Sequence, residues 1–373
     1  MNRAQRGSRW GRRGLGCALF AACCASACGP TAAPPETSAA AKPSTPKLHD
    51  GPLLDYVPAA GLRWLVAGRP RELAHNSDFA AALEPLLPTA RLDAYAASTG
   101  VDLRTLPSAA VAGFGLGTMY LAETLADNAR TEELFALRVE GQPILDRPHP
   151  RVTRMLGVVD GEPQALVSIR GRLVALAAGD PTLARVVEAF ARKQLRESPP
   201  ALEGAALSTL PKRLNRSPIR FYAPGPFEGE WSAGARGLLS AATALAITAD
   251  PVTPGKLGAA LVLAGDWGSP SNDAKRHLSE AWEDLAGSPT GRLLGLNRPA
   301  TPPQVTTTEN SLELRVELEL APIVAGLRAA VIADVWEILD LPPPEPQRTE
   351  SPADAQPAEN ASDFHETGRA GRD

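Results

Sequence analysis

Cysteine is confined to one end of this chain, and this confinement limits how the rest can be stabilised. All four cysteines, Cys17, Cys23, Cys24 and Cys28, lie within the first 28 of 373 residues. The remainder can therefore form neither a disulfide nor a thiolate metal site. Because 44% of the residues are hydrophobic and only 5% are aromatic, the core must consist mainly of aliphatic side chains.

The N-terminal segment has the pattern of a signal peptide. Residues 1–14 carry five arginines and no acidic residue, and the stretch from Leu15 to Ala27 is apolar and small. This apolar run is shorter than the roughly 20 residues that a spanning helix needs. We therefore expect residues 1–27 to be removed on export rather than retained as a membrane anchor.

The residues just before Cys28 predict lipidation. Ala25-Ser26-Ala27 are small, so they fit the extended groove of a protease that cleaves before a lipid-bearing cysteine. Together with Cys28 they resemble the bacterial lipobox, which implies acylation of Cys28. Cys23 is a second candidate, and a plain secretory signal cut near Ala27 is the alternative.

The export route and the final membrane follow from residues on either side of this motif. Arg12 and Arg13 partly resemble a twin-arginine signal, but the rest of that pattern is missing, which favours the general secretory route. Gly29 stands where an aspartate would be typical of inner-membrane retention. This resemblance implies an outer-membrane lipoprotein that faces the periplasm.

Two low-complexity segments flank the expected globular part. Residues 28–47 are nearly all Pro, Ala, Ser and Thr, and predict a disordered tether that starts at the lipidated cysteine. Residues 342–373 begin with a proline cluster and predict a disordered acidic tail. After removal of residues 1–27, the chain keeps 33 basic and 42 acidic side chains without a basic run, which argues against a nucleic-acid partner.

Hydrophobic periodicity predicts an α+β fold. Residues 312–320 alternate between large apolar and charged side chains, as expected for a strand with one buried and one solvated face. Helices are predicted at 77–87 and 89–99. Further strands are predicted at 63–68, 109–114, 118–122, 134–140, 155–159, 165–169, 173–177 and 219–223.

A strand followed by a proline and an apolar helical stripe occurs twice, at Pro181 and at Pro322. This recurrence predicts a tandem duplication, with a first α+β unit at 48–200 and a second at 201–341. Each half is expected to be an antiparallel sheet with helices packed on one face. The lipobox, the linker and these helix starts resemble uncharacterised lipoproteins of high-GC proteobacteria with tandem α+β units, a resemblance that implies no known activity.

Metal and cofactor motifs are missing from the sequence. No H-E-x-x-H pair, glycine-rich phosphate loop or G-x-S-x-G elbow occurs, so we predict no catalytic residue, cofactor or metal. Asp273, His277, Glu280 and Asp284 share one helical face, but the opposite face is apolar. That pattern is typical of the wet side of an amphipathic helix.

Dispersed carboxylates and a few loop residues remain as candidates. Paired acids can lie far apart in sequence, so a hydrolase that uses Asp146, Asp160, Asp250 or Asp266 stays an alternative, although turns commonly contain aspartate.

Three further residues are candidates for a surface site. His149 lies between two prolines and predicts a rigid exposed loop. Trp231 and Trp267 lie in Gly- and Asp-containing loops that could line a cleft.

These observations favour a lipid-anchored envelope protein with a non-catalytic role. The chain is expected to contact the membrane through the N-terminal lipid. Its folded part is expected to bind or scaffold an unknown envelope protein. A carrier of a lipid or other apolar ligand is the alternative, and it requires a concave sheet with an apolar pocket.

Overall fold

The structure, a computed structural model, describes residues 47–125, 127–195, 198–229, 235–252, 254–268 and 271–338. The predicted signal peptide, Cys28, Trp231 and the predicted acidic tail lie outside these residues. From Lys47 onward, the described residues form one compact unit.

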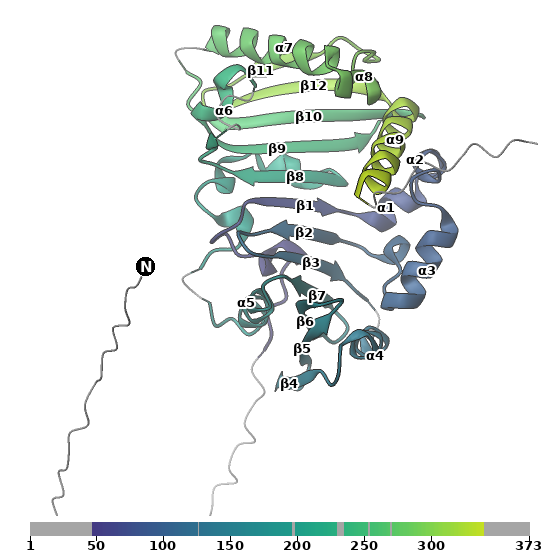
Figure 1. The fold of residues 1–373 in the computed structure, drawn as a ribbon. Helices are drawn as coiled ribbons and strands as arrows, with labels where there is room; N and C mark the ends of the chain where they lie inside the picture. Colours follow the sequence, from purple (N-terminus) through teal and green to yellow (C-terminus); the bar gives the residue numbers. More distant parts are fainter. Residues whose placement is uncertain are drawn as a thin grey trace, which may run out of the picture. The chain divides into compact units, whose positions relative to one another are not determined.

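An antiparallel 12-stranded sheet organises the described residues (Figure 1). Its strand order is β11-β12-β10-β9-β8-β1-β2-β3-β7-β6-β5-β4. The strands are β1 (Trp64–Gly68), β2 (Ala109–Gly113), β3 (Thr118–Glu123), β4 (Ile144–His149), β5 (Val152–Val159), β6 (Glu162–Ile169), β7 (Leu173–Ala178), β8 (Ile219–Pro224), β9 (Ala242–Pro251), β10 (Lys256–Gly265), β11 (Gln304–Thr307) and β12 (Ser311–Glu319).

Helices lie on both faces of this sheet. The α-helices are α1 (Pro70–His75), α2 (Ser77–Leu83), α3 (Thr89–Thr99), α4 (Ala129–Arg138), α5 (Thr182–Ala191), α6 (Leu238–Ala241), α7 (Ser271–Gly287), α8 (Pro289–Leu293) and α9 (Leu320–Ile338). The short 3-10 helices are η1 (Leu53–Tyr56), η2 (Leu103–Thr105), η3 (Ala201–Glu203), η4 (Leu207–Thr209) and η5 (Lys212–Arg216).

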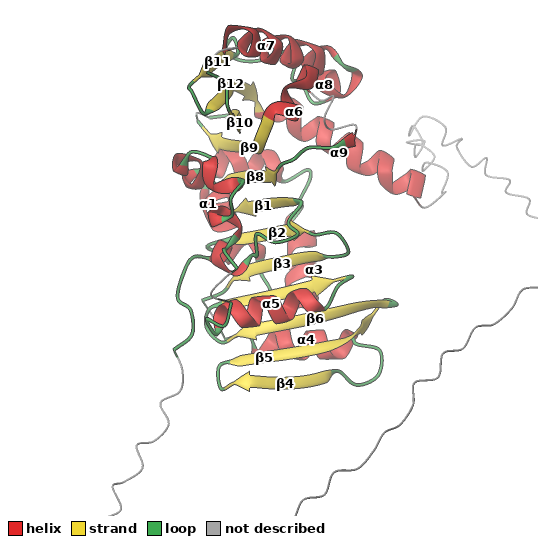
Figure 2. Cartoon of the chain, turned by 90° about the vertical axis from the view of Figure 1, so that its left-hand side faces the viewer, coloured by secondary structure: helices red, strands yellow, loops and turns green. Residues whose placement is uncertain are grey.

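The two faces are covered differently. The face that carries Leu65 and Tyr222, called the cleft face below, packs against α5, η1, η3, η4 and η5 in a core of mainly aliphatic residues. The face that carries Val66 and Phe221, called the open face, packs against α7, α4 and α9 at its margins. Figure 2 shows α5 in front of β6 and α4 behind it.

The α+β class is confirmed, but two equal halves are not. Strands β1 to β7 come from the predicted first unit and β8 to β12 from the second, and β1 pairs with β8 so that both units share one sheet. Within the first unit, α5 packs on the cleft face and α4 on the open face. The expectation that each half carries its helices on one face is therefore wrong for the first unit.

Several local predictions are confirmed. Helix α3 spans the predicted residues and ends at Gly100, whose φ of 74° is the left-handed conformation that glycine adopts without strain. The predicted meander forms as β5, β6 and β7, paired in sequence order. The glycine-rich stretch after Gly113 is a hairpin between β2 and β3, in which the Phe114 N–H donates to the Gly117 carbonyl.

The strand predicted at residues 134–140 is wrong, because most of this segment belongs to α4. Phe135 and Val139 are four residues apart and therefore lie on the same side of a helix. Both pack against Met155 and Leu166 in one core cluster. The alternation that suggested a strand fits a short amphipathic helix equally well.

Both edges of the sheet are irregular or short. At one edge, the register of β4 against β5 shifts between Asp146 and His149, and β4 contains Pro148, which has no N–H to donate. At the other edge, β11 is only 4 residues long.

The charged side of β12 is not fully solvated, contrary to expectation. Glu313 is buried on the cleft face, where Arg213 donates to its two carboxylate oxygens at 3.1 and 2.5 Å. Arg315 adds a third hydrogen bond at 2.7 Å. Burial alone would raise the pKa of Glu313, but the hydrogen bonds from these two arginines lower it below its usual value.

Glu313→Gln is expected to lower the free energy of unfolding by about 1–2 kcal/mol at neutral pH, because the charge-assisted hydrogen bonds are lost. A lowered folded-state pKa stabilises above the unfolded pKa and loses its effect as the pH falls through the folded pKa, so the difference should start to shrink below about pH 4. Urea unfolding at several pH values measures this difference in the free energy of unfolding. Glu319→Gln, an exposed position on the same strand, is the control, and equal behaviour of the two variants would contradict the assignment.

Candidate functional site

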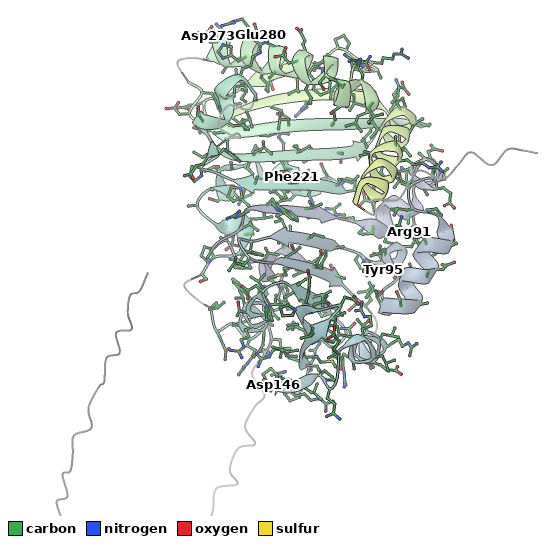
Figure 3. All side chains as sticks on the ribbon, viewed as in Figure 1. Arg91, Tyr95, Asp146, Phe221, Asp273 and Glu280 are labelled. Carbon is green, nitrogen blue, oxygen red and sulfur yellow. The ribbon has the colours of Figure 1, made fainter. Side chains whose placement is uncertain are left out.

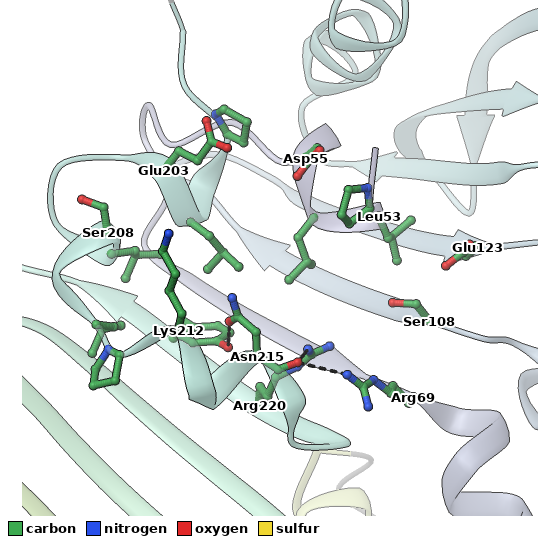
Figure 4. Close-up of a pocket in the computed structure, with 18 of the residues that line it drawn as sticks. Leu53, Asp55, Arg69, Ser108, Glu123, Glu203, Ser208, Lys212, Asn215 and Arg220 are labelled. Carbon is green, nitrogen blue, oxygen red and sulfur yellow. Dashed lines mark hydrogen bonds between the residues drawn. The ribbon is translucent and has the colours of Figure 1, made fainter. Parts of the chain in front are cut away.

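A cavity of about 790 Å³ lies on the cleft face, between η1 and the segment that carries η3 to η5 (Figure 4). We call it the central cleft. It is lined by leucines from both walls and by side chains of both charges. The leucines are Leu53, Leu54, Leu202, Leu207 and Leu210, the cations are Arg69, Lys212 and Arg220, and the acids are Asp55, Glu123 and Glu203.

Strand β8 places an arginine in the central cleft. Because side chains alternate along a strand, Ile219 and Phe221 face the open side while Arg220 and Tyr222 face the cleft. In register, Arg220 lies between Ala67 of β1 and Thr248 of β9, neither of which carries a charge. The strand pattern thus fixes a cation in the middle of the sheet.

Arg220 is buried and forms no salt bridge with the described residues. Its side chain is only 6% exposed, and its Nη1 donates to the Asn215 carbonyl oxygen at 2.5 Å. Its Nε has no hydrogen-bond partner, and no carboxylate of the described residues forms a salt bridge with it. A buried cation with an unmet donor costs free energy unless something compensates it.

The electrostatic surroundings of Arg220 compensate this charge only in part. Burial lowers the pKa of Arg220, whereas the neighbouring Tyr222 opposes that effect; Arg69 lowers the pKa further, and the Glu72 carboxylate raises it. A guanidinium nevertheless keeps its proton in proteins. The cleft floor is therefore positively charged.

Asn215 connects this floor to the cleft wall. Its backbone carbonyl accepts from Arg69 Nη2 at 3.1 Å as well as from Arg220, so two guanidinium groups converge on one oxygen. Its side-chain Oδ1 accepts from the Tyr222 hydroxyl at 2.8 Å. Burial raises the pKa of Tyr222 to about 12, which keeps the phenol a neutral donor.

Charge is distributed unevenly along the central cleft. Figure 4 shows Arg69, Arg220 and Asn215 at one end, with Asp55 and Glu203 toward the other. Asp55 is paired with His49 Nε2 at 3.0 Å, so its charge is partly engaged. A ligand that spans the cleft would meet cations at one end and leucines along the walls.

A second notable surface is a row of large apolar residues across the open face. Directly opposed strand partners form it; they are Leu314, Leu261, Ile247, Phe221, Val66, Val111, Tyr120, Leu176 and Leu166. In its centre, Ile247, Val66 and Tyr120 are 43%, 38% and 45% exposed. Figure 3 shows Phe221 in the part of this face that no helix covers.

Two residues predicted for a surface site are buried instead. His149 ends β4 with 8% exposure, and its Nδ1 accepts from the Arg151 N–H at 3.1 Å. Trp267 is 2% exposed, and its indole N–H donates to the Leu263 carbonyl at 3.1 Å. The flanking prolines and glycine suggested loops, but neighbouring elements cover both rings. The other candidates, Trp231 and Cys28, lie outside the described residues.

The dispersed aspartates do not converge. Asp146 pairs with Arg154 on β4 and β5, and Asp160 lies in the turn that joins β5 to β6. Asp250, near the end of β9, accepts from the Ser217 hydroxyl at 2.8 Å, whereas Asp266 follows β10 at the opposite end of the paired strands.

The acidic face of α7 is occupied by arginines. Arg276 pairs with Asp273 and Glu280, each at 3.2 Å, and Arg236 pairs with Glu280 and Asp284, each at 2.8 Å. Within the described residues, no group of three or more His, Cys, Asp or Glu is placed to hold a metal ion.

Arg220 was not recognised from the sequence as a site residue. Residues 219–223 were predicted as a strand, and a single arginine between Ile219 and Phe221 is the one signal they offer. Its burial arises from the segment 201–216 that crosses the cleft face, and this segment shows no helical or strand periodicity.

No protein-family model matches the chain, and no curated protein matches its sequence. Among solved structures, crystal form IV of TP0453 is similar, with 9% sequence identity and a TM-score of 0.44, covering 74% of this chain and 96% of that chain. This similarity is too low to assign a family. Among the described residues, no helix is both long and apolar enough to cross a bilayer.

Proposed function

We propose that this chain is a lipid-anchored protein of the bacterial envelope that binds a small ligand in the central cleft. The observation that carries the proposal is the cavity of about 790 Å³ on the cleft face, within the size range of small-molecule sites. Its leucine-lined walls favour the carrier alternative over scaffolding. Acylation at Cys28 would hold the binding domain at the outer membrane, facing the periplasm.

The composition of the cleft supports ligand binding over simple packing. Leu207 and Leu210 come from one wall and Leu53 and Leu54 from the other; they pack in the core and border the cavity with the small part of their surface that stays exposed. A few polar groups, among them Ser108 and Asn215, lie between them. Apolar walls with a few fixed polar groups are typical of pockets that orient a small molecule.

Filling the cleft should weaken this binding. Ser208→Trp places an indole at an exposed lining position and is expected to weaken binding of the neutral dye Nile red by about tenfold, measured by fluorescence titration. Ser240→Trp on α6 is the matched control, because both hydroxyls donate to the carbonyl three residues earlier. Equal dye affinity in the two variants would remove the cleft from the proposal.

Membrane attachment should depend on Cys28. Cys28→Ala is expected to move the protein from the membrane to the soluble fraction and to remove the acyl mass, as measured by fractionation and intact mass spectrometry. Cys23→Ala, which alters the second candidate, should leave both unchanged. The reverse result would shift the lipid to Cys23, and no change in either variant would remove the anchor.

A second candidate function is docking of an envelope protein on the open face. The exposed centre of the apolar row, at Ile247, Val66 and Tyr120, favours it, because clustered apolar side chains in water commonly mark interaction surfaces.

Ile247→Lys places a charge in this row and should reduce capture of the partner from envelope extracts by about tenfold. Thr243→Lys, an exposed position on the same strand, is the control. The Nile red affinity of the cleft should stay the same in Ile247→Lys, which separates the two functions, and unchanged capture would exclude docking here.

A further inference from the structure

The floor of the central cleft contains a buried positive charge that forms no salt bridge with any of the described residues. The Arg220 side chain is 94% buried, and its Nε donates to nothing. By contrast, other buried ionic groups of the described residues are paired. Glu188 accepts from Arg154 and Arg192, and Glu313 accepts from Arg213 and Arg315. Arg220 is thus an exception that needs an explanation.

We propose that Arg220 binds an oxyanion, a carboxylate or phosphate group, carried by a small molecule in the central cleft. This inference rests on the proposed ligand-binding role of that cleft and specifies the chemical class of the ligand. A guanidinium presents planar paired donors that match the oxygens of such groups. Arg220 lines the cavity, and its buried Nε has no hydrogen-bond partner in the protein.

The neighbours of Arg220 strengthen the choice of an anion. Arg69 donates to the same Asn215 carbonyl, which brings a second guanidinium to this end of the cleft. Lys212 lines the cleft from η5 and is exposed. Arg69 forms a salt bridge with Glu72 at 3.2 Å, whereas Arg220 forms none with the described residues and feels the Glu72 charge without direct contact.

The rest of the cleft indicates what the oxyanion is attached to. Beyond the cationic end, the walls present leucines, and the far end presents the acids Asp55 and Glu203, which would repel a second anionic group. An amphiphile with one anionic head and an aliphatic body fits this distribution. A free inorganic anion would use only the cationic end.

The test uses the mature full-length protein and four probes measured by isothermal titration calorimetry. Decanoate supplies a carboxylate with an aliphatic chain, decanol supplies the same chain without charge, and acetate and inorganic phosphate supply the anion alone. Decanoate is expected to bind about tenfold to a hundredfold more tightly than decanol. Tighter binding of phosphate or acetate than of decanoate, lost with Arg220, would also support the oxyanion site and identify a free anion as its source.

Substitution at Arg220 provides the residue-level test. Arg220→Met keeps most of the volume, removes the charge, and should reduce decanoate affinity to that of decanol while leaving decanol affinity unchanged. Arg91→Met, at an exposed position of α3 (Figure 3), is the matched control and should change neither. The Arg220→Met protein should melt at the same or a higher temperature, because a buried charge that forms no salt bridge has been removed.

Specific outcomes would overturn the inference. If Arg220→Met binds decanoate as tightly as the unchanged protein does, or if decanoate and decanol bind equally, Arg220 holds no oxyanion. If Ser208→Trp still weakens the binding of both probes in that case, the proposed ligand-binding function of the central cleft stands. If no probe binds, both proposals fail. Should Arg220→Met not fold, Arg220→Lys decides: an affinity loss of about tenfold supports a paired guanidinium contact, and unchanged affinity contradicts it.

Discussion

The pairing of β1 with β8 is the interaction on which the rest of the structure depends. Its register places Leu65 opposite Tyr222 on the cleft face and Val66 opposite Phe221 on the open face. A slip of one residue would exchange the two faces and move Arg220 out of the cleft. Without this pairing, two strand edges would also be left with unpaired backbone groups. One set of backbone hydrogen bonds therefore holds the sheet together and positions both candidate surfaces.

Local sequence patterns predicted the elements whose structure depends on residues close together in the sequence. The alternation in β12, the apolar runs of the β5-β6-β7 meander and the glycine that ends α3 each predicted an observed element. Residues 134–140 were misread because a segment of this length satisfies both periodicities, and its contacts with Met155 decide in favour of a helix. The single shared sheet was not predictable, since it requires knowing that β1 and β8, which are far apart in sequence, are neighbours.

Most of the candidate site could not be predicted from the sequence for the same reason. Its walls come from η1 and from η3 to η5, and its floor comes from β8, so no contiguous motif contains it. His149 shows the reverse error: two flanking prolines suggested a loop, but an edge strand tolerates Pro148 because the strand has no outer partner to which it must donate. The predicted binding role and the proposed oxyanion site depend on different parts of the cleft, the first on its walls and the second on Arg220.

The irregular edge strands of the sheet limit how copies of the protein can associate. Strand β4 carries a proline and a register shift, and β11 is short, so neither border offers a long, regular ladder of free backbone groups to another molecule. Copies of the protein that come close together would therefore be protected from polymerising through strand addition. Any self-association would have to proceed through side chains, which makes it reversible and tunable by single substitutions.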